Sequence, residues 1–210
     1  MSPPSEQVDP SARPSRAERR ELQLTEVETL RAMAHPLRMR IIGSLRVDGP
    51  ATSALLARRL DTDSGQTSHH LRLLARYGFV VEALELGKGA HGRERWWKSA
   101  TESTRWTDDL DRLGAGGAEA IRAFEQAAYR VWGSLVDAYR DQVAKGEWDS
   151  AWLEAAGSGD MVVRLTPERL VAMRDEILQV VERHDLKDHP ADDAETVVVI
   201  LQAYPRRVPK

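Results

Sequence analysis

The segment of residues 67–80 constrains the fold most, because a helical pattern gives way there, without a linker, to a β-rich run. In helical spacing Thr67, Leu71 and Leu74 share one edge, and this edge is the one expected to be buried. Gly78 ends the pattern, since glycine readily adopts the backbone conformation that closes a helix. The segment therefore predicts a short amphipathic helix that leads directly into a strand.

The opposite edge of this helix carries side chains that can bind a nucleic acid. Ser68, His69 and Arg72 lie on it, and Gln66 stands at its start, where bases are usually reached. Arginine can hold guanine through two hydrogen bonds, and glutamine can do the same with adenine. The alternative is an ordinary helix with a solvated polar face. His70 lies closer to the buried edge, so we expect it to pack or to position a phosphate rather than to read a base.

The chain ahead of this helix predicts three further helices. Residues 25–34 form the first, with Thr25 as N-cap and Glu28 completing a capping box. Residues 36–46 form the second, because a proline, which is favoured at the first helical position, opens it. Residues 53–60 form the third, and a polar turn separates it from the amphipathic helix.

Two strand-like runs follow the glycine, at residues 79–86 and 93–98, and a loop rich in glycine and positive charge joins them. This pattern is a β-hairpin signal. Lys88, Arg93 and Arg95 suit contact with phosphates or with the minor groove of DNA. Helices followed by a hairpin in this order predict a winged helix-turn-helix, in which the hairpin is the wing.

Two blocks carry a resemblance to a known family. Residues 30–42, and residues 67–71 together with 78–80, resemble the ArsR/SmtB family of bacterial winged-helix regulators over roughly residues 25–98. The resemblance implies a homodimeric DNA-binding transcriptional regulator, often a repressor that a ligand releases. The helix that carries a cysteine pair in metal-sensing members reads Thr-Ser-Ala-Leu-Leu-Ala at residues 52–57, without a thiol. Metal sensing through thiols therefore does not carry over.

Charge is distributed unevenly along the chain. The formal net charge is −3, but residues 35–98 contain 11 Lys and Arg against 6 Asp and Glu. Residues 101–204 contain 11 Lys and Arg against 21 Asp and Glu. This asymmetry indicates a basic segment with an anionic partner and an acidic segment with a different role.

Composition excludes several classes of protein. The chain has no cysteine, so it has neither disulfides nor thiolate metal sites. No apolar run approaches the roughly 20 residues of a membrane helix, and the polar N-terminus lacks the apolar core of a signal peptide. We therefore expect a cytoplasmic protein with no membrane partner. Residues 1–22 contain almost nothing apolar and are expected to be a disordered arm.

The second half of the chain predicts a long helix and a small strand–helix–strand unit. Residues 118–145 carry apolar side chains at steps of three and four, so we expect this helix to form a dimer interface. Residues 161–165 and 196–201 are predicted strands, with a helix that begins at Thr166-Pro167 between them. Two strands alone make too small a sheet, so this unit should pack on the long helix or extend a sheet across a dimer. The predicted dimerisation residues are Ile121, Phe124, Ala128, Val131, Leu135 and Tyr139.

The expected fold is thus mainly α, within the α+β class. A winged helix-turn-helix DNA-binding domain is expected at residues 23–100. A domain for dimerisation, and for any effector, is expected at residues 101–210.

A metal site is not predicted. His184, Asp185, His189, Asp192 and Asp193 are the only cluster that combines imidazole with carboxylate, a set that can suit zinc or nickel. These residues fall in an acidic loop, where a solvated face is the favoured reading.

Neither an enzyme nor a cofactor is expected. No nucleophile elbow, phosphate-binding glycine loop or His-Glu-x-x-His zinc motif occurs. The six tryptophans can line a pocket for a small molecule, or they can pack in the core and in a dimer interface. Packing is the favoured reading.

These observations predict a sequence-specific DNA-binding transcriptional regulator, in the form of a homodimeric repressor that thiol-bound metal does not control. Two recognition helices would enter successive major grooves of near-palindromic double-stranded DNA, about one helical turn apart. The acidic half would supply the dimer interface and leaves room for a small-molecule effector. The alternative is a winged-helix module that binds a protein or a small ligand without DNA, which the basic segment disfavours.

Overall fold

The computed structural model describes residues 21–86, 94–186 and 194–207. The chain divides into two compact units, Met1–Asp137 and Ala138–Lys210. The domain boundary predicted near residue 100 falls inside the first unit. Among the described residues, no helix combines the length and the apolar character that crossing a membrane requires.

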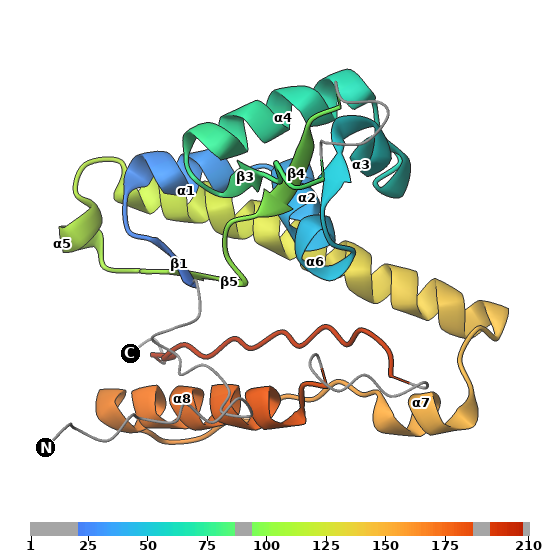
Figure 1. Cartoon of the computed structure of the whole chain (residues 1–210). Coiled ribbons are helices and arrows are strands. Elements are labelled where there is room, and N and C mark those ends of the chain that lie inside the picture. The colour runs from blue at the N-terminus through green and yellow to red at the C-terminus, as the bar shows by residue number, and fades with distance from the viewer. Residues whose placement is uncertain (1–20, 87–93, 187–193, 208–210) are drawn as a thin grey trace, which may run out of the picture. The chain divides into compact units, whose positions relative to one another are not determined.

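Four helices form the helix-turn-helix region of the first unit (Figure 1). They are α1 Val27–Met33, α2 Pro36–Val47, α3 Ser53–Arg59 and α4 Ser64–Arg76. Each matches a helix predicted from the sequence. The start of α3 shows why: the hydroxyl oxygen of its N-cap, Thr52, accepts a hydrogen bond from the backbone N–H of Leu55 at 3.2 Å.

The start of α1 differs from the prediction. Its N-cap is Glu26, which makes no side-chain capping bond, so the predicted capping box of Thr25 and Glu28 is wrong. Burial sets the position of this helix, because Val27 and Leu30 both lie in the core. Covering these two side chains outweighs a cap, which stabilises a helix by only about 1 kcal/mol.

The wing belongs to a three-stranded antiparallel sheet. Its strands, in spatial order, are β2 Ala51–Thr52, β4 Trp96–Ser99 and β3 Val80–Glu82. The predicted hairpin is confirmed by the pairing of Val80 with Ser99 and of Glu82 with Trp97, although both strands are shorter than predicted. The wing loop, residues 87–93, lies outside the described residues.

A second sheet was not predicted. Strand β1, Glu21–Leu24, pairs in parallel with β5, Ser103–Trp106. Residues 21 and 22, predicted to end a disordered arm, therefore belong to a strand, and this part of the prediction is wrong. Residue 21 meets a partner 82 positions later, at residue 103, so no local pattern could indicate the pairing. The fully buried Leu24 anchors β1 in the core.

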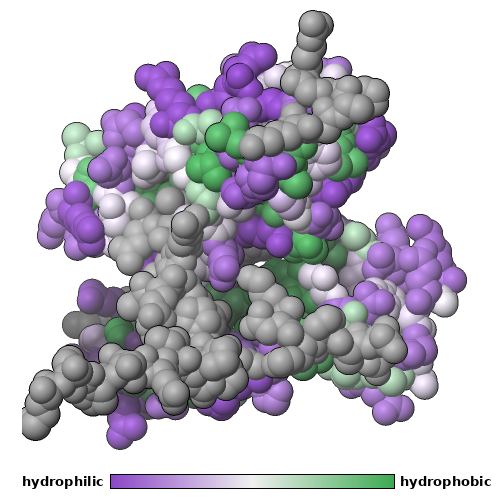
Figure 2. Space-filling view, in the orientation of Figure 1, coloured by the Kyte–Doolittle hydropathy of each residue, from purple (hydrophilic) through white to green (hydrophobic). Residues whose placement is uncertain are grey.

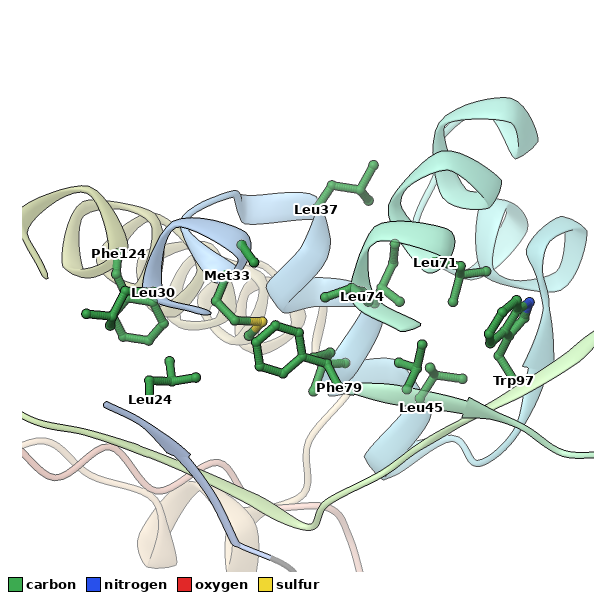
Figure 3. Packing of buried hydrophobic residues seen from close by; sticks show 14 of the residues in the cluster. Leu24, Leu30, Met33, Leu37, Leu45, Leu71, Leu74, Phe79, Trp97 and Phe124 are labelled. Atoms are coloured by element: carbon green, nitrogen blue, oxygen red, sulfur yellow. The ribbon is translucent and has the colours of Figure 1, made fainter. Parts of the chain in front are cut away.

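A short helix, α5 Leu110–Leu113, precedes the long helix α6, Gly117–Lys145, and α6 confirms the long helix predicted from the sequence. The first half of α6 contributes Ile121 and Phe124 to the core of the first unit. Figure 3 shows Phe124 beside Leu30 of α1, and Phe79 beside Met33. One continuous core therefore joins the winged helix-turn-helix to the start of α6.

The second unit contains α7, Ser150–Ala155, and α8, Pro167–His184. The predicted start of α8 is confirmed, because the N-cap Thr166 accepts a hydrogen bond through its hydroxyl oxygen from the backbone N–H of Arg169 at 3.3 Å. None of the described residues between 138 and 207 is buried.

The strand–helix–strand prediction is wrong for the strands. Residues 161–165 and 196–201 form no strand in the structure, and only α8 between them takes its predicted form. A strand needs hydrogen-bonding partners along its backbone, and the described part of the chain offers none to either segment.

Candidate nucleic-acid interface

The first turn of α4 is fixed by its cap. The Oδ1 atom of Asp63 accepts hydrogen bonds from the backbone N–H of Gly65 at 2.8 Å and from that of Gln66 at 3.0 Å. A carboxylate at this position satisfies free N–H groups and complements the positive end of the helix dipole. The cap therefore fixes the backbone from which the exposed Gln66 side chain extends.

The buried edge of α4 is tied to α3 and to the core. Thr67 is fully buried, and its Oγ1 lies 2.8 Å from the carbonyl oxygen of Ser53 and 3.0 Å from that of Ser64. Leu71 and Leu74 are also fully buried. This confirms the predicted apolar edge, and it forces the opposite edge of α4 to face outward.

The outward edge of α4 brings four predicted DNA-binding residues together. Gln66, His69 and Arg72 are exposed, and Ser68 is half-buried. The Nη2 atom of Arg72 donates a hydrogen bond to the Oγ of Ser68 at 3.1 Å. A guanidinium carries five N–H donors, so this contact orients Arg72 while other donors still point outward. In Figure 2 the coloured part of the upper edge, where Figure 1 places α4, is mostly hydrophilic.

His70 is turned inward, toward the start of α2. Its ring centroid lies 4.6 Å from that of His35 and 5.4 Å from that of His69. Burial, followed by the positive fields of His35, Arg38 and His69, lowers the pKa of His70 to about 4. An imidazole that is neutral at pH 7 offers no positive charge to a phosphate. Of the two roles expected for His70, the geometry favours packing.

The wing contributes Arg95 to the candidate interface. Its side chain is exposed, its Nε lies 3.4 Å from Oε2 of Glu82, and its guanidinium carbon lies 5.7 Å from the Trp97 ring centroid. These contacts place Arg95 beside β4. Replacing the ion pair with a contact to another partner would cost little free energy, because exposed ion pairs contribute at most about 1 kcal/mol. Lys88 and Arg93, the other two predicted wing residues, lie outside the described residues.

Two further arginines were not included in the predicted site. Arg58 and Arg59 form the last turn of α3, and both are exposed. Arg59 donates from Nη2 to the carbonyl oxygen of Asp48 at 3.2 Å. The sequence showed both as outward-facing, but only the position of α3 beside α4 marks them as candidates for phosphate contact. In helix-turn-helix proteins the helix before the recognition helix crosses the DNA backbone.

The predicted dimerisation residues of α6 occupy two different environments. Ile121, Phe124 and Ala128 are buried inside the chain's own first unit, so they are not free surface for a partner. Val131 is half-buried and Leu135 is 42% exposed. The exposed apolar surface of α6 in the first unit also includes two residues not predicted, Tyr129 and Val136. In the second unit, Tyr139 is half-buried.

The tryptophans contact other aromatic rings. In the first unit, the ring centroid of Trp106 lies 4.9 Å from that of Phe124 and 6.3 Å from that of Trp132. In the second unit, Trp148 lies 5.9 Å from Trp152 between centroids, and its Nε1 donates to Oε1 of Gln142 at 3.2 Å. These distances are typical of aromatic packing.

Among the described residues, no three His, Asp or Glu side chains gather in a group that could hold a metal ion. Of the cluster considered from the sequence, His184 and Asp185 are described, whereas His189, Asp192 and Asp193 lie outside the described residues.

Comparison with known proteins identifies the domain type. The family model of a helix-turn-helix domain matches residues 33–83, which span α2, α3, α4 and β3. This match confirms the helix-turn-helix resemblance in that segment, about a quarter of the chain. No curated protein matches the chain.

Two solved structures show limited likeness. The transcriptional regulator homologue from Pyrococcus horikoshii OT3 is 24% identical with a TM-score of 0.30, and the match covers 52% of this chain and 92% of that one. The transcriptional regulator Tm0710 from Thermotoga maritima is 10% identical with a TM-score of 0.28, and the match covers 74% and 87% respectively. TM-scores of this size do not establish a common fold for the whole chain.

Proposed function

We propose that this protein is a sequence-specific DNA-binding transcriptional regulator that acts as a homodimeric repressor. The outward edge of α4 is the observation that carries the proposal. It presents Gln66, Ser68, His69 and Arg72 on one side of a helix whose other side is locked into the core. The match of this segment to a helix-turn-helix domain supports the same conclusion.

Each group has a distinct role in this proposal. Arg72 and Gln66 reach base edges in the major groove, since each can form two hydrogen bonds with one base. Ser68 orients Arg72 through their 3.1 Å contact. Arg95 and Arg58 contact phosphates on either side of α4 and fix its position on the duplex. Lys88 and Arg93 of the wing would add to the phosphate contacts.

The charge distribution supports this arrangement. The basic segment of residues 35–98 contains α4 and the wing, and the acidic segment that follows would be repelled by the duplex. Docking on DNA is thereby restricted to one part of the chain. A homodimer would present α4 twice, which matches near-palindromic double-stranded DNA. The proposal includes no catalytic step, no cofactor and no thiol-bound metal.

Binding to duplex DNA tests the proposal. Random duplexes would be selected for binding to the full chain, and the enriched sequence would then be titrated at several salt concentrations. Affinity for the enriched site should fall steeply with salt, with a slope of about −0.9 for each neutralised phosphate. Salt-independent binding, or no enrichment at all, would contradict the proposal.

Two variants separate base reading from charge. Arg72→Ala should cost about 1–3 kcal/mol in binding free energy and relax selection at one base position. Arg72→Lys keeps the charge but loses the two-pronged contact, so selection should relax there as well. Arg122→Ala removes an exposed arginine of α6 and is the matched control, because it changes the net charge equally. Equal losses for Arg72→Ala and Arg122→Ala would show that only charge matters.

A further inference from the structure

The second unit lacks a core of its own. None of the described residues between 138 and 207 is buried, although this unit contains strongly apolar segments. Met161 is 89% exposed and Val162 is 96% exposed. Helix α8 has an apolar face that includes Leu170 and Ile177, yet no residue of α8 is buried. Exposed apolar area of this kind favours association, because covering it contributes about 25 cal/mol for each Å².

The C-terminal segment, residues 194–207, contains an apolar run that the described residues leave uncovered. Its five consecutive apolar residues, 197–201, are all exposed, on both faces of an extended backbone. Such a run is typical of a strand covered on both faces, and it needs more surface than α8 alone can provide. The described residues give its backbone no hydrogen-bonding partner within the chain. As far as the described residues go, its backbone edges are unpaired and its apolar side chains are exposed on both faces.

The charges of this segment identify a partner. Glu195 stands at its start, preceded in sequence by Asp192 and Asp193, whereas Arg206 and Arg207 stand at its end. Two copies that run antiparallel would place the acidic end of each beside the basic end of the other. Two copies that run in parallel would place like charges side by side, which destabilises a strand pair. The segment is thus complementary in charge to a second copy of itself.

We propose that the C-terminal segments of two chains pair with each other as antiparallel strands across a two-fold axis. A two-fold axis is the symmetry of most homodimers, and it relates identical strands in antiparallel order. Alignment of Glu195 with Arg207 of the second chain places this axis at residue 201, so that the two copies of Leu201 lie directly opposite each other on one face. The inference rests on the homodimer in the proposed function but does not depend on DNA binding.

Disulfide trapping tests the pairing in the full-length chain. The protein has no cysteine, so each single-cysteine variant reports on one position alone. A disulfide needs Cα atoms about 4.4–6.8 Å apart. At the axis, the two copies of residue 201 lie opposite each other, about 4.5–5.5 Å apart between Cα atoms. The two copies of residue 197 would be offset by eight residues, or about 26 Å, at about 3.3 Å a residue.

Leu201→Cys is therefore expected to give mostly disulfide-linked dimers after mild oxidation, read on a non-reducing gel. Val197→Cys should give no more than Val47→Cys, an exposed valine of the first unit that serves as the collision control. Equal trapping at 197 and 201 would indicate parallel pairing and overturn the proposal. No trapping above the control at either position would also overturn it, and would point to a different occupant for the segment.

A charge exchange provides a second, independent measurement. Arg207→Glu in the Leu201→Cys chain should lower the yield of trapped dimer, and the further change Glu195→Lys should restore it. Failure of this restoration would contradict the antiparallel register. Light scattering and DNA titration of the same samples separate the two proposals. A dimer that binds DNA but is never trapped would overturn the strand pairing alone, whereas a monomer that binds no DNA would overturn both.

Discussion

His35 and His70 face each other across the junction of α2 and α4, with ring centroids 4.6 Å apart and planes inclined by 40°. The Nδ1 atom of His35 accepts a hydrogen bond from the backbone N–H of Leu37 at 3.1 Å and so caps α2. The Nδ1 atom of His70 is buried without a hydrogen-bonding partner among the described residues. The contact therefore joins the start of α2 to α4 through two imidazoles, and their surroundings favour the neutral form of both.

Acid should weaken the first unit through this contact. Burial, followed by Arg38 and Arg130, lowers the pKa of His35, and burial first of all lowers that of His70 to about 4. In the unfolded chain both pKa values return to about 6.5, so the unfolded state takes up protons first. The contribution of these two histidines to the free energy of unfolding should be complete above pH 6.5 and should be lost as the pH drops toward 4. Urea titrations between pH 7.5 and 4 measure this loss.

His70→Gln should flatten that pH profile, because it removes the more strongly shifted imidazole. His184→Gln serves as the control, since it removes an exposed imidazole that belongs to the second unit. A profile that keeps its full slope in His70→Gln would show that other groups cause the acid sensitivity.

Thr67→Val should destabilise the first unit by about 1–2 kcal/mol. The substitution keeps the shape of the side chain but removes the hydroxyl that lies within 2.8 Å of the Ser53 carbonyl and 3.0 Å of the Ser64 carbonyl. The midpoint of urea unfolding, at constant m-value, measures the change. Thr67→Ser keeps the hydroxyl and loses only one methyl group, so it should retain the hydrogen bonds. A valine variant as stable as the parent would mean that the hydroxyl contributes nothing.

Arg46→Met should cost about 2–3 kcal/mol of unfolding free energy. Its guanidinium reaches from α2 to the second sheet, with Nε 2.9 Å from the carbonyl oxygen of Thr101, and Nη2 3.0 Å from the Oγ1 of Thr101 and 2.9 Å from that of Thr104. Burial lowers the pKa of Arg46 to about 10, so it remains charged at neutral pH and its hydrogen bonds are charge-assisted. Thermal or urea unfolding checks the loss.

Arg46→Lys should recover only part of that stability, because an ammonium group cannot match three acceptors in the plane of a guanidinium. Arg40→Met is a matched control, with a single bond of 2.8 Å from Nη2 to the Leu60 carbonyl oxygen. If Arg46→Met and Arg40→Met lower the free energy of unfolding equally, the hydrogen bonds of Arg46 stabilise the protein no more than the single bond of Arg40 does.

Leu135→Glu should shift the protein toward monomers if the exposed part of α6 forms the main dimer interface. Leu135 is 42% exposed and follows the half-buried Val131 by one helical turn. A carboxylate buried at an interface without a partner is strongly unfavourable. Light scattering at several concentrations measures the effect. Gln126→Glu, at an exposed site on the same helix, adds the same single negative charge and is the control. An unchanged dimer would exclude this surface of α6.

Local patterns predicted the helices well. Helices α2 and α8 each begin with a proline, and both were expected at Pro36 and Pro167 from this signal, with Thr166 as the predicted N-cap of α8. The two-sided character of α4 likewise followed from periodicity, because residues three and four apart share a face whatever surrounds the helix.

The strand pairings and several contacts of the site could not be predicted in this way. Strand β1 meets β5 across 82 positions, and Arg46 meets Thr101 across 55. The contact between His35 and His70 likewise depends on how α2 packs against α4. None of these contacts produces a periodic pattern in the sequence, because the partners come together only through the folding of the whole chain.

The amino-acid sequence by itself determined which side chains of α4 share the outward edge, and hence which residues are candidates for reading DNA. Only the tertiary structure decided which apolar surfaces are covered. It buries the start of α6 beside Leu30 and leaves Leu135 exposed, although both halves of the helix have the same apolar spacing. Periodicity fixes the face on which a residue lies, but the surface that covers that face comes from distant parts of the chain or from another molecule.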